Sequence, residues 1–150
     1  MMYLLDTNVI SELRKQTSGK ADKKVVAWAK SVPADSLYLS VITIMELEMG
    51  VLSIQRKDPQ QGNLLRLWLN SQVIPAFSNR LLAIGVPIAQ CCASLHIPDP
   101  RSERDALIAA TAIVNGMTVV TSSWPAALPM LAITPSLSMV RVSAASVCCW

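Results

Sequence analysis

A short apolar segment that ends on a carboxylate is the feature of this sequence that most constrains the fold. Residues 2–5 read Met-Tyr-Leu-Leu, the length and composition of a strand buried on both faces, and Asp6 ends the run abruptly. The apolar residues of segment 9–13 follow with helical spacing. We therefore expect Asp6 at the carboxyl end of a buried strand, the edge where open α/β sheets bind ligands. A simpler role stays open, because Asp6 or Asn8 could merely cap the helix.

Length and composition describe one globular domain over residues 1–150. Hydrophobic residues make up 52% of the chain and charged residues 15%, which suffices for a core without disulfides and is too apolar for a disordered protein. The net charge of +3 favours anionic partners only weakly. The charge is unevenly placed, because no Asp or Glu follows Asp105 and Arg141 is the only charged residue in segment 106–150.

The cysteines and the apolar segments predict a cytoplasmic protein without a membrane span. The four cysteines form two adjacent pairs, at 91–92 and 148–149, and show no zinc-binding spacing, so we expect reduced thiols. The apolar start is too short for a secretory signal. Segment 106–140 is uncharged up to its end, but an asparagine, a glycine and three prolines interrupt it, which argues against a spanning helix.

Hydrophobic periodicity predicts strands that alternate with helices. Strands are predicted at 2–5, 37–40, 81–84 and 117–121, with a last one at 139–142. Helices are predicted at 9–13, 25–33, 44–54, 59–73, 88–95 and 102–115. Strands separated by helices indicate an α/β fold with a mostly parallel sheet of four to five strands.

Helical geometry distinguishes an acid that faces the sheet from one that faces water. Glu46 shares its face of the predicted helix with Thr43 and Gly50, which are small and leave room for a metal or a substrate. Glu48 points about 200° away from Glu46, at 3.6 residues per turn. We therefore expect Glu46 in a site and Glu48 in solvent.

Asp105 allows two interpretations. Its helix face carries small alanines, which again leaves room for a ligand. However, Ser102 and Asp105 also have the spacing of a capping box, in which the two residues satisfy the first N–H groups of the helix. Arg101, Glu103 and Arg104 are expected in solvent, although the arginines would be able to hold phosphate oxygens.

Asp6, Glu46 and Asp105 come from separate segments, each near the carboxyl end of a strand or the start of the helix after it. Three carboxylates that converge there would repel one another unless a cation lay between them. Hard oxygen ligands favour Mg²⁺ or Mn²⁺, and such an ion can activate water and stabilise a phosphodiester under attack. Many α/β proteins carry acids at strand ends, so this constellation alone is only moderately specific.

Three segments carry a family resemblance. Residues 3–13 read Tyr-Leu-Leu-Asp-Thr-Asn-Val-Ile-Ser-Glu-Leu, residues 40–47 run from Ser-Val-Ile-Thr to Glu-Leu, and residues 104–112 read Arg-Asp-Ala-Leu-Ile-Ala-Ala-Thr-Ala. In this order they resemble the PIN-domain nucleases, and among these the VapC toxins of type II toxin–antitoxin modules, including plasmid-stability proteins. The resemblance covers residues 2–121.

The resemblance implies a fold, an activity and partners. The fold would be a PIN-like three-layer α/β/α arrangement. The activity would be that of a Mg²⁺- or Mn²⁺-dependent endoribonuclease that acts on RNA, forms a homodimer and is held inactive by a cognate VapB-like antitoxin. Asp6, Glu46 and Asp105 would be the catalytic, metal-coordinating carboxylates, with Asn8 and Thr121 as supporting polar neighbours.

The chain departs from the family pattern after Thr121. The family continues with Arg-Asn and, a few residues later, with Asp-Phe, which adds a fourth acid, whereas segment 122–127 reads Ser-Ser-Trp-Pro-Ala-Ala and no acid follows. We interpret residues 122–150 as a divergent tail read in a shifted frame. If no other frame of the neighbouring DNA encodes Arg-Asn-x-x-Asp-Phe, this hypothesis fails. Losing one carboxylate ligand should weaken metal binding and impair activity.

Other functional classes fit less well. A haloacid-dehalogenase-like phosphatase needs a second aspartate where Asn8 stands, and a receiver domain needs a late lysine, whereas the last one is Lys57. No glycine-rich phosphate-binding motif is present. The main alternative is a catalytically inactive PIN-like module that still binds an antitoxin through apolar grooves.

Overall fold

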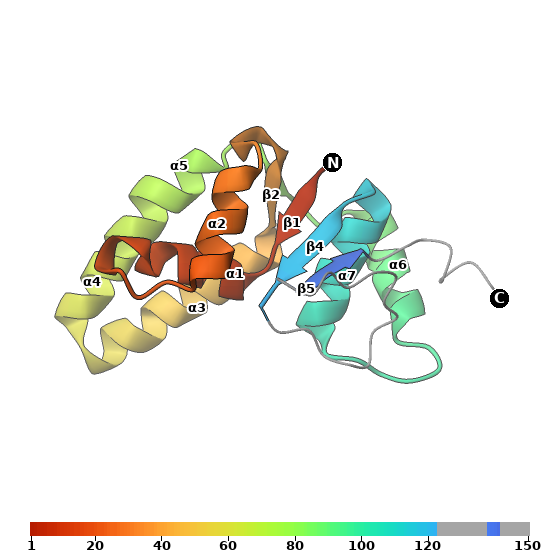
Figure 1. Ribbon diagram of the computed structural model, residues 1–150. Coiled ribbons are helices and arrows are strands. Elements are labelled where there is room, and N and C mark those ends of the chain that lie inside the picture. Colours follow the sequence, from red (N-terminus) through yellow and green to blue (C-terminus); the bar gives the residue numbers. More distant parts are fainter. Residues whose placement is uncertain (123–137, 142–150) are drawn as a thin grey trace.

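The computed structural model describes residues 1–122 and 138–141, and its centre is a five-stranded sheet in the order β3-β2-β1-β4-β5 (Figure 1). The strands are β1 Tyr3–Leu5, β2 Leu37–Ser40, β3 Leu81–Leu82, β4 Thr118–Thr121 and β5 Ser138–Arg141. The first four are parallel to one another, and β5 runs antiparallel to β4. The predicted mostly parallel sheet is confirmed. The predicted third strand is shorter than expected, because it ends at Leu82.

Seven α-helices surround this sheet in the part of the chain that the structure describes. They are α1 Thr7–Arg14, α2 Lys23–Ser31, α3 Val41–Lys57, α4 Pro59–Trp68, α5 Ile74–Ala76, α6 Val86–Leu95 and α7 Glu103–Asn115. Short 3-10 turns span Lys15–Ser18 and Ala34–Ser36, and a π-helical turn, Leu69–Val73, joins α4 to α5.

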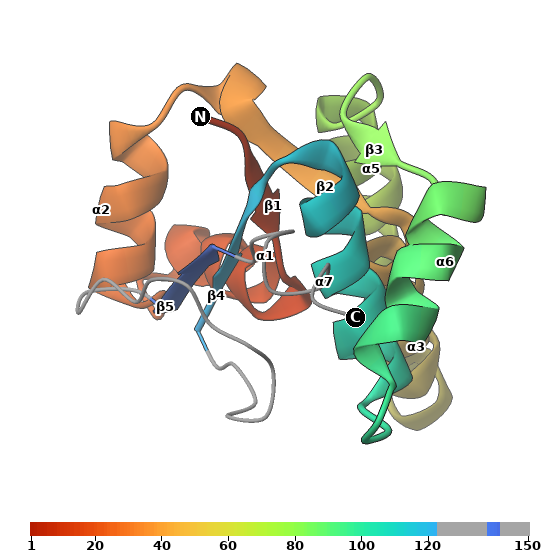
Figure 2. The same cartoon turned by 90° about the vertical axis from the view of Figure 1, so that its right-hand side faces the viewer.

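The helices form two layers, because neighbouring residues of each buried strand point to opposite faces of the sheet. Leu4 and Val119 pack against α6 and α7, whereas Leu5 and Val120 pack against α1 to α4. All four side chains are fully buried. Figure 2 shows α2 on one side of the sheet and α6 and α7 on the other. The three-layer α/β/α fold predicted from the sequence is therefore confirmed.

Helix α7 runs back along the sheet and so brings its first turn to the carboxyl edge. Its alanines at 106, 109 and 110 are fully buried, and their small size lets the helix lie close to the strands. It stops at Gly116, which adopts the left-handed conformation at φ 64° that favours glycine. Because β4 begins at Thr118, the other end of α7 lies near the carboxyl ends of the strands.

Helices α3 and α4 form a tight hairpin that projects from the sheet (Figure 1). Asp58 alone separates them and caps α4, since its Oδ1 accepts a hydrogen bond from the Gln61 N–H at 3.1 Å. The helix start predicted here is confirmed. The two helices approach each other closely at Gly62, where an added Cβ would lie 2.5 Å from the backbone nitrogen of Gln55.

Gly62→Ala is expected to destabilise the protein, although alanine is the better helix former. The new methyl group would overlap backbone atoms of α3, and overpacking of this kind costs about 1–3 kcal/mol. The melting temperature should fall by roughly 2–10 °C. Gly50→Ala in α3 is the matched control, because no atom lies within 4 Å of its added Cβ, and it should raise the melting temperature slightly. A Gly62→Ala protein as stable as the wild type would contradict this packing.

No helix among the residues that the structure describes is both long and apolar enough to cross a membrane.

Candidate active site: an acidic cluster at the carboxyl edge of the sheet

Asp6 directly follows β1, and both of its carboxylate oxygens are engaged. Oδ1 accepts a hydrogen bond from the Thr7 N–H at 2.8 Å and caps α1, while Oδ2 accepts one from the hydroxyl of Thr121 at 2.7 Å. The Asp6 N–H also donates to the Val120 carbonyl at 3.0 Å, which continues the β1–β4 pairing. The two roles considered for Asp6 are therefore compatible: one oxygen caps the helix, and the other lies at the end of β4.

Glu46 of α3 reaches the same edge from the other side. Its Oε1 accepts a hydrogen bond from the Thr7 hydroxyl at 3.1 Å, and its Oε2 lies 3.5 Å from Nη1 of Arg104. One turn earlier, the buried Thr43 hydroxyl donates to the Leu5 carbonyl at 3.3 Å and ties α3 to the end of β1. Helix α3 is thus anchored close to the contact between Glu46 and Thr7.

Glu48 lies outside this cluster. It forms an ion pair with Arg66 of α4, on the opposite side of α3 from Glu46. Its side chain is 39% exposed, against 24% for Glu46. The expected separation of the two acids is therefore present in the structure, although Glu48 has a partner instead of standing alone in water.

Asp105 lies in the first turn of α7, and its place in the order of strands and helices differs from the expected one. It does not follow a strand, because α7 comes after α6 and precedes β4. Ser102 occupies the N-cap position but makes no side-chain hydrogen bond to the helix. The capping box considered for Ser102 and Asp105 is therefore not formed.

The three acids act on one another electrostatically. Burial is the main reason why the pKa of Asp6 is raised; repulsion from Asp105 adds to it, and the hydrogen bonds from Thr121 and Thr7 oppose it. Burial also raises the pKa of Glu46, and so does repulsion from Asp6 and Asp105, against the opposing effects of Thr7 and Arg104. The negative charge of Asp105 therefore acts on both Asp6 and Glu46, and that of Asp6 also acts on Glu46.

The donor chemistry fits a hard divalent cation, since carboxylate oxygens are the ligands that Mg²⁺ and Mn²⁺ prefer. A cation would also relieve the repulsion that raises these pKa values. As the side chains stand, however, no group of three or more His, Cys, Asp or Glu residues within the described part of the chain could hold a metal ion. Coordination by Asp6, Glu46 and Asp105 together would require these side chains to move, and it stays a prediction.

The polar neighbours of the acids differ from the predicted pair. Thr121 is fully buried and contacts Asp6 directly, whereas Asn8 is an exposed residue on the first turn of α1 whose role stays a prediction. Thr7 was not predicted, yet its N–H and its hydroxyl bridge Asp6 and Glu46. Its position directly after Asp6, within the first motif, is the signal that could have identified it.

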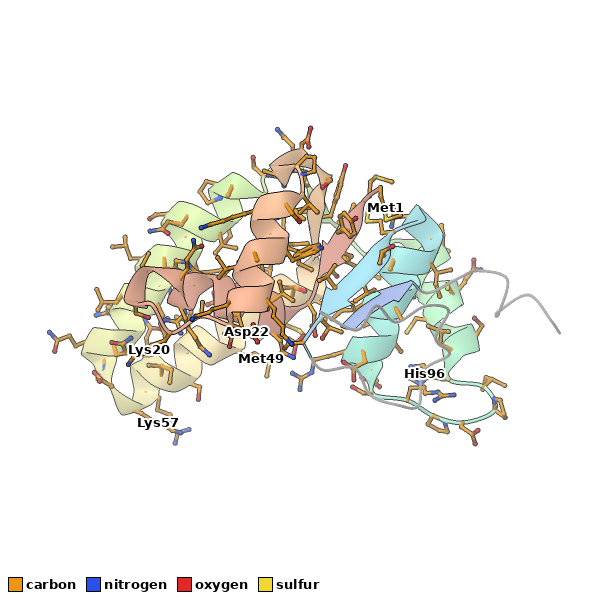
Figure 3. All side chains as sticks on the ribbon, in the orientation of Figure 1. Met1, Lys20, Asp22, Met49, Lys57 and His96 are labelled. Carbon is orange, nitrogen blue, oxygen red and sulfur yellow. The ribbon has the colours of Figure 1, made fainter. Side chains whose placement is uncertain are left out.

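The single histidine plays a structural part. His96 lies at the end of α6 (Figure 3), and its Nδ1 accepts a hydrogen bond from the Arg101 N–H at 3.0 Å. This bond fixes the loop between α6 and α7. Cys92 is a buried free thiol, as expected.

Fold and site together define a class of protein: a three-layer α/β domain whose parallel sheet carries coupled carboxylates, from the end of β1, from α3 and from α7, at its carboxyl edge. Within that class, the chain belongs to the PIN domain family, whose model matches residues 3–123.

Individual relatives are toxins and ribonucleases. The chain is similar to toxin FitB of Neisseria gonorrhoeae, with 36% identity over 126 residues that cover 80% of this chain and 86% of the relative. It is similar to the VapC ribonuclease Y4jK of Sinorhizobium fredii, with 34% identity over 125 residues and the same coverage. A crystal structure of FitAcB from Neisseria gonorrhoeae superposes with a TM-score of 0.72 and 34% identity, over 81% of this chain and 88% of that one. The predicted likeness to VapC-type toxins is confirmed.

Proposed function

We propose that this chain is a Mg²⁺- or Mn²⁺-dependent endoribonuclease toxin that cleaves RNA phosphodiester bonds and is neutralised by a cognate VapB-like antitoxin. Membership of the PIN family and the similarity to a VapC ribonuclease and to a toxin support the class of activity. The observation that carries the proposal is the gathering of acidic side chains at the carboxyl edge of the sheet, where Thr7 joins Asp6 to Glu46 and Arg104, the neighbour of Asp105, pairs with Glu46.

The roles of the side chains follow from their positions. Asp6, Glu46 and Asp105 would hold the divalent ion, which when bound would supply Lewis acidity and an activated water. The Thr121 hydroxyl, at 2.7 Å, holds one Asp6 oxygen in place. Thr7 connects Asp6 to Glu46, so that the end of β1 and the helix α3 keep their relative position.

A groove between α1 and α4 supports the antitoxin as a partner. It has a volume of about 470 Å³, and its walls include Leu13, Leu65, Trp68 and Phe77. Arg14 lies over the Trp68 ring at 5.7 Å from its centroid and forms a charged rim. An apolar segment of an antitoxin with an acidic flank would fit this combination.

A separate apolar stripe supports the homodimer. Four exposed residues of α3 lie within about 80° of arc on one face of the helix, at 100° per residue. They are Val41, Met45, Met49 and Leu52. Figure 3 shows Met49 on the outer surface of α3. Pairing two such stripes would bury apolar surface that water otherwise contacts.

One observation favours a second candidate, the inactive PIN-like module that only binds an antitoxin. No Asp or Glu follows Asp105 anywhere in the sequence, so a fourth carboxylate from the end of the chain is missing. With three acids the metal site would be weaker, and activity would be impaired or lost. RNA cleavage by the purified protein separates the two candidates.

Glu46→Gln is expected to slow RNA cleavage about 10- to 100-fold, because it removes one charge from the proposed metal site. The assay follows a labelled single-stranded RNA with purified protein in Mg²⁺ or Mn²⁺. Glu48→Gln is the matched control, since it removes the same charge two residues away on the same helix, where Glu48 pairs with Arg66. It should cleave at the wild-type rate.

Two results would overturn the proposed function. If the wild-type protein cleaves no RNA in either metal but binds an antitoxin, the chain is a binding module. If it cleaves RNA and Glu46→Gln and Glu48→Gln lower the rate equally, the acidic cluster is not the active site.

A further inference from the structure

Arg104 is, within the described part of the chain, the one cation in an ion pair with a carboxylate of the acidic cluster. Its Nη1 lies 3.5 Å from Oε2 of Glu46, and its presence opposes the rise in the pKa of Glu46. The Arg104 side chain is 49% exposed. It therefore joins the cluster on one side and faces solvent on the other.

Other basic side chains around the sheet are engaged elsewhere. Arg66 pairs with Glu48, and Lys15 pairs with Glu12. Arg14 lies over the ring of Trp68. Among these basic side chains, Arg104 is the one that an ion pair places beside the acidic cluster, where it can meet an approaching anion.

An RNA substrate needs such a group. Its phosphates are negative, and Asp6, Glu46 and Asp105 present negative charge at the place where the proposed cleavage occurs. A guanidinium group offers several N–H donors in a fixed plane that matches phosphate oxygens, and Glu46 occupies only one side of it in this structure.

We propose that Arg104 is a substrate-binding residue that holds an RNA phosphate beside the acidic cluster. The inference rests on the proposed ribonuclease function and deepens it. The Glu46 contact would position the guanidinium group before RNA arrives, and the N–H donors that Glu46 does not engage would meet the phosphate. Because the face of α7 behind Arg104 is packed with buried alanines, the helix supplies a rigid base for the side chain.

The test measures RNA binding separately from cleavage. A fluorescent single-stranded RNA is titrated in Mg²⁺ with Asp6→Asn protein, which is expected to leave the RNA intact, and with the double variant that also carries Arg104→Ala. The double variant should bind at least about 10-fold more weakly, since charge-assisted hydrogen bonds are lost. The slope of log K against log salt should become shallower by about 0.7, the value for one phosphate contact in a single strand.

Three further variants in the Asp6→Asn background sharpen the result. Arg56→Ala removes an equal charge from the last turn of α3. Unlike Arg104→Ala, it should leave the RNA affinity and the salt slope unchanged. Arg104→Lys should keep the salt slope but lose part of the affinity, because an ammonium group does not match the phosphate as a fork does. Arg104→Gln repeats the loss of charge with a longer side chain, and melting curves establish that each variant is folded.

The outcomes are distinct. The inference is overturned if Arg104→Ala and Arg56→Ala lower affinity and slope equally, because Arg104 then only neutralises Glu46. If the wild type cleaves RNA while this result is found, the proposed function stands without the inference. If the wild type cleaves no RNA and Asp6→Asn protein binds none, both fail.

Discussion

Replacing Asp6 with asparagine is expected to remove RNA cleavage and, at the same time, to make the metal-free protein more stable at neutral pH. The Asp6 carboxylate is central to the cluster, so its loss should remove several kcal/mol of metal-assisted stabilisation of the transition state. That loss corresponds to about a 1,000-fold slower reaction. Asparagine has nearly the same shape, and its side-chain oxygen and amide can still meet the Thr7 N–H and the Thr121 hydroxyl.

The gain in stability follows from the direction of the pKa shift. The pKa of Asp6 is raised in the folded protein, mainly by burial, so folding favours the protonated carboxyl. Its favourable contribution is complete below the pKa of the unfolded chain and is lost as the pH rises through the folded pKa. At pH 7 the ionised, partly buried Asp6 therefore destabilises the fold. Asparagine removes this effect, so we expect the melting temperature at neutral pH to rise by a few degrees.

Asp22→Asn is the matched control for this prediction. Asp22 also caps a helix, since its Oδ1 accepts a hydrogen bond from the Lys24 N–H at 2.7 Å, but it is exposed and lies at the start of α2 (Figure 3). Aspartate and asparagine are equally good caps, so Asp22→Asn should change neither cleavage nor melting temperature. If Asp6→Asn behaved in the same way, Asp6 would be a helix cap and nothing more.

The strands and helix ends were predictable because local physics fixes them. The run 2–5 and the segment 37–40 are apolar enough to indicate buried strands. The side chain of Asp58 caps the start of α4, and the left-handed backbone of Gly116 ends α7. The third strand was predicted too long for a reason that lies outside it. It pairs with β2 only as far as Ser40, which already caps α3, so Leu82 is the last residue with a partner.

The site was predictable only in part, because its contacts join distant segments. The helical face of Glu46 could be read from its small neighbours, and Asp6 from the end of its strand. The bond between Thr7 and Glu46 spans 39 positions, and no local pattern encodes it. Asp105 fitted a capping box by spacing alone, and only the packing of α7 shows that its turn meets the other acids. Arg104 was expected in solvent for the same reason.

A divalent ion should reverse the order of stability of the wild type and Asp6→Asn. In EDTA the wild type carries the partly buried charge of Asp6 and its repulsion with neighbouring acids, so Asp6→Asn should melt at the higher temperature. A bound ion removes that repulsion, and at a hundred times its dissociation constant it adds about 2.7 kcal/mol to the folded state. The melting temperature of the wild type should then rise by roughly 5–10 °C, measured by thermal denaturation in EDTA and in increasing Mn²⁺.

The Asp6→Asn protein should shift much less, because one ligand of the proposed site is gone, whereas Asp22→Asn should follow the wild type. This comparison needs no RNA, so it also applies to a chain that has lost cleavage with its fourth acid. Equal shifts for the wild type and Asp6→Asn would mean that the ion binds elsewhere. No shift for either at saturating Mn²⁺ would leave the three carboxylates without a metal. Another cation would then balance the negative charge at the end of β1. The structure places Arg104, which already pairs with Glu46, in that position.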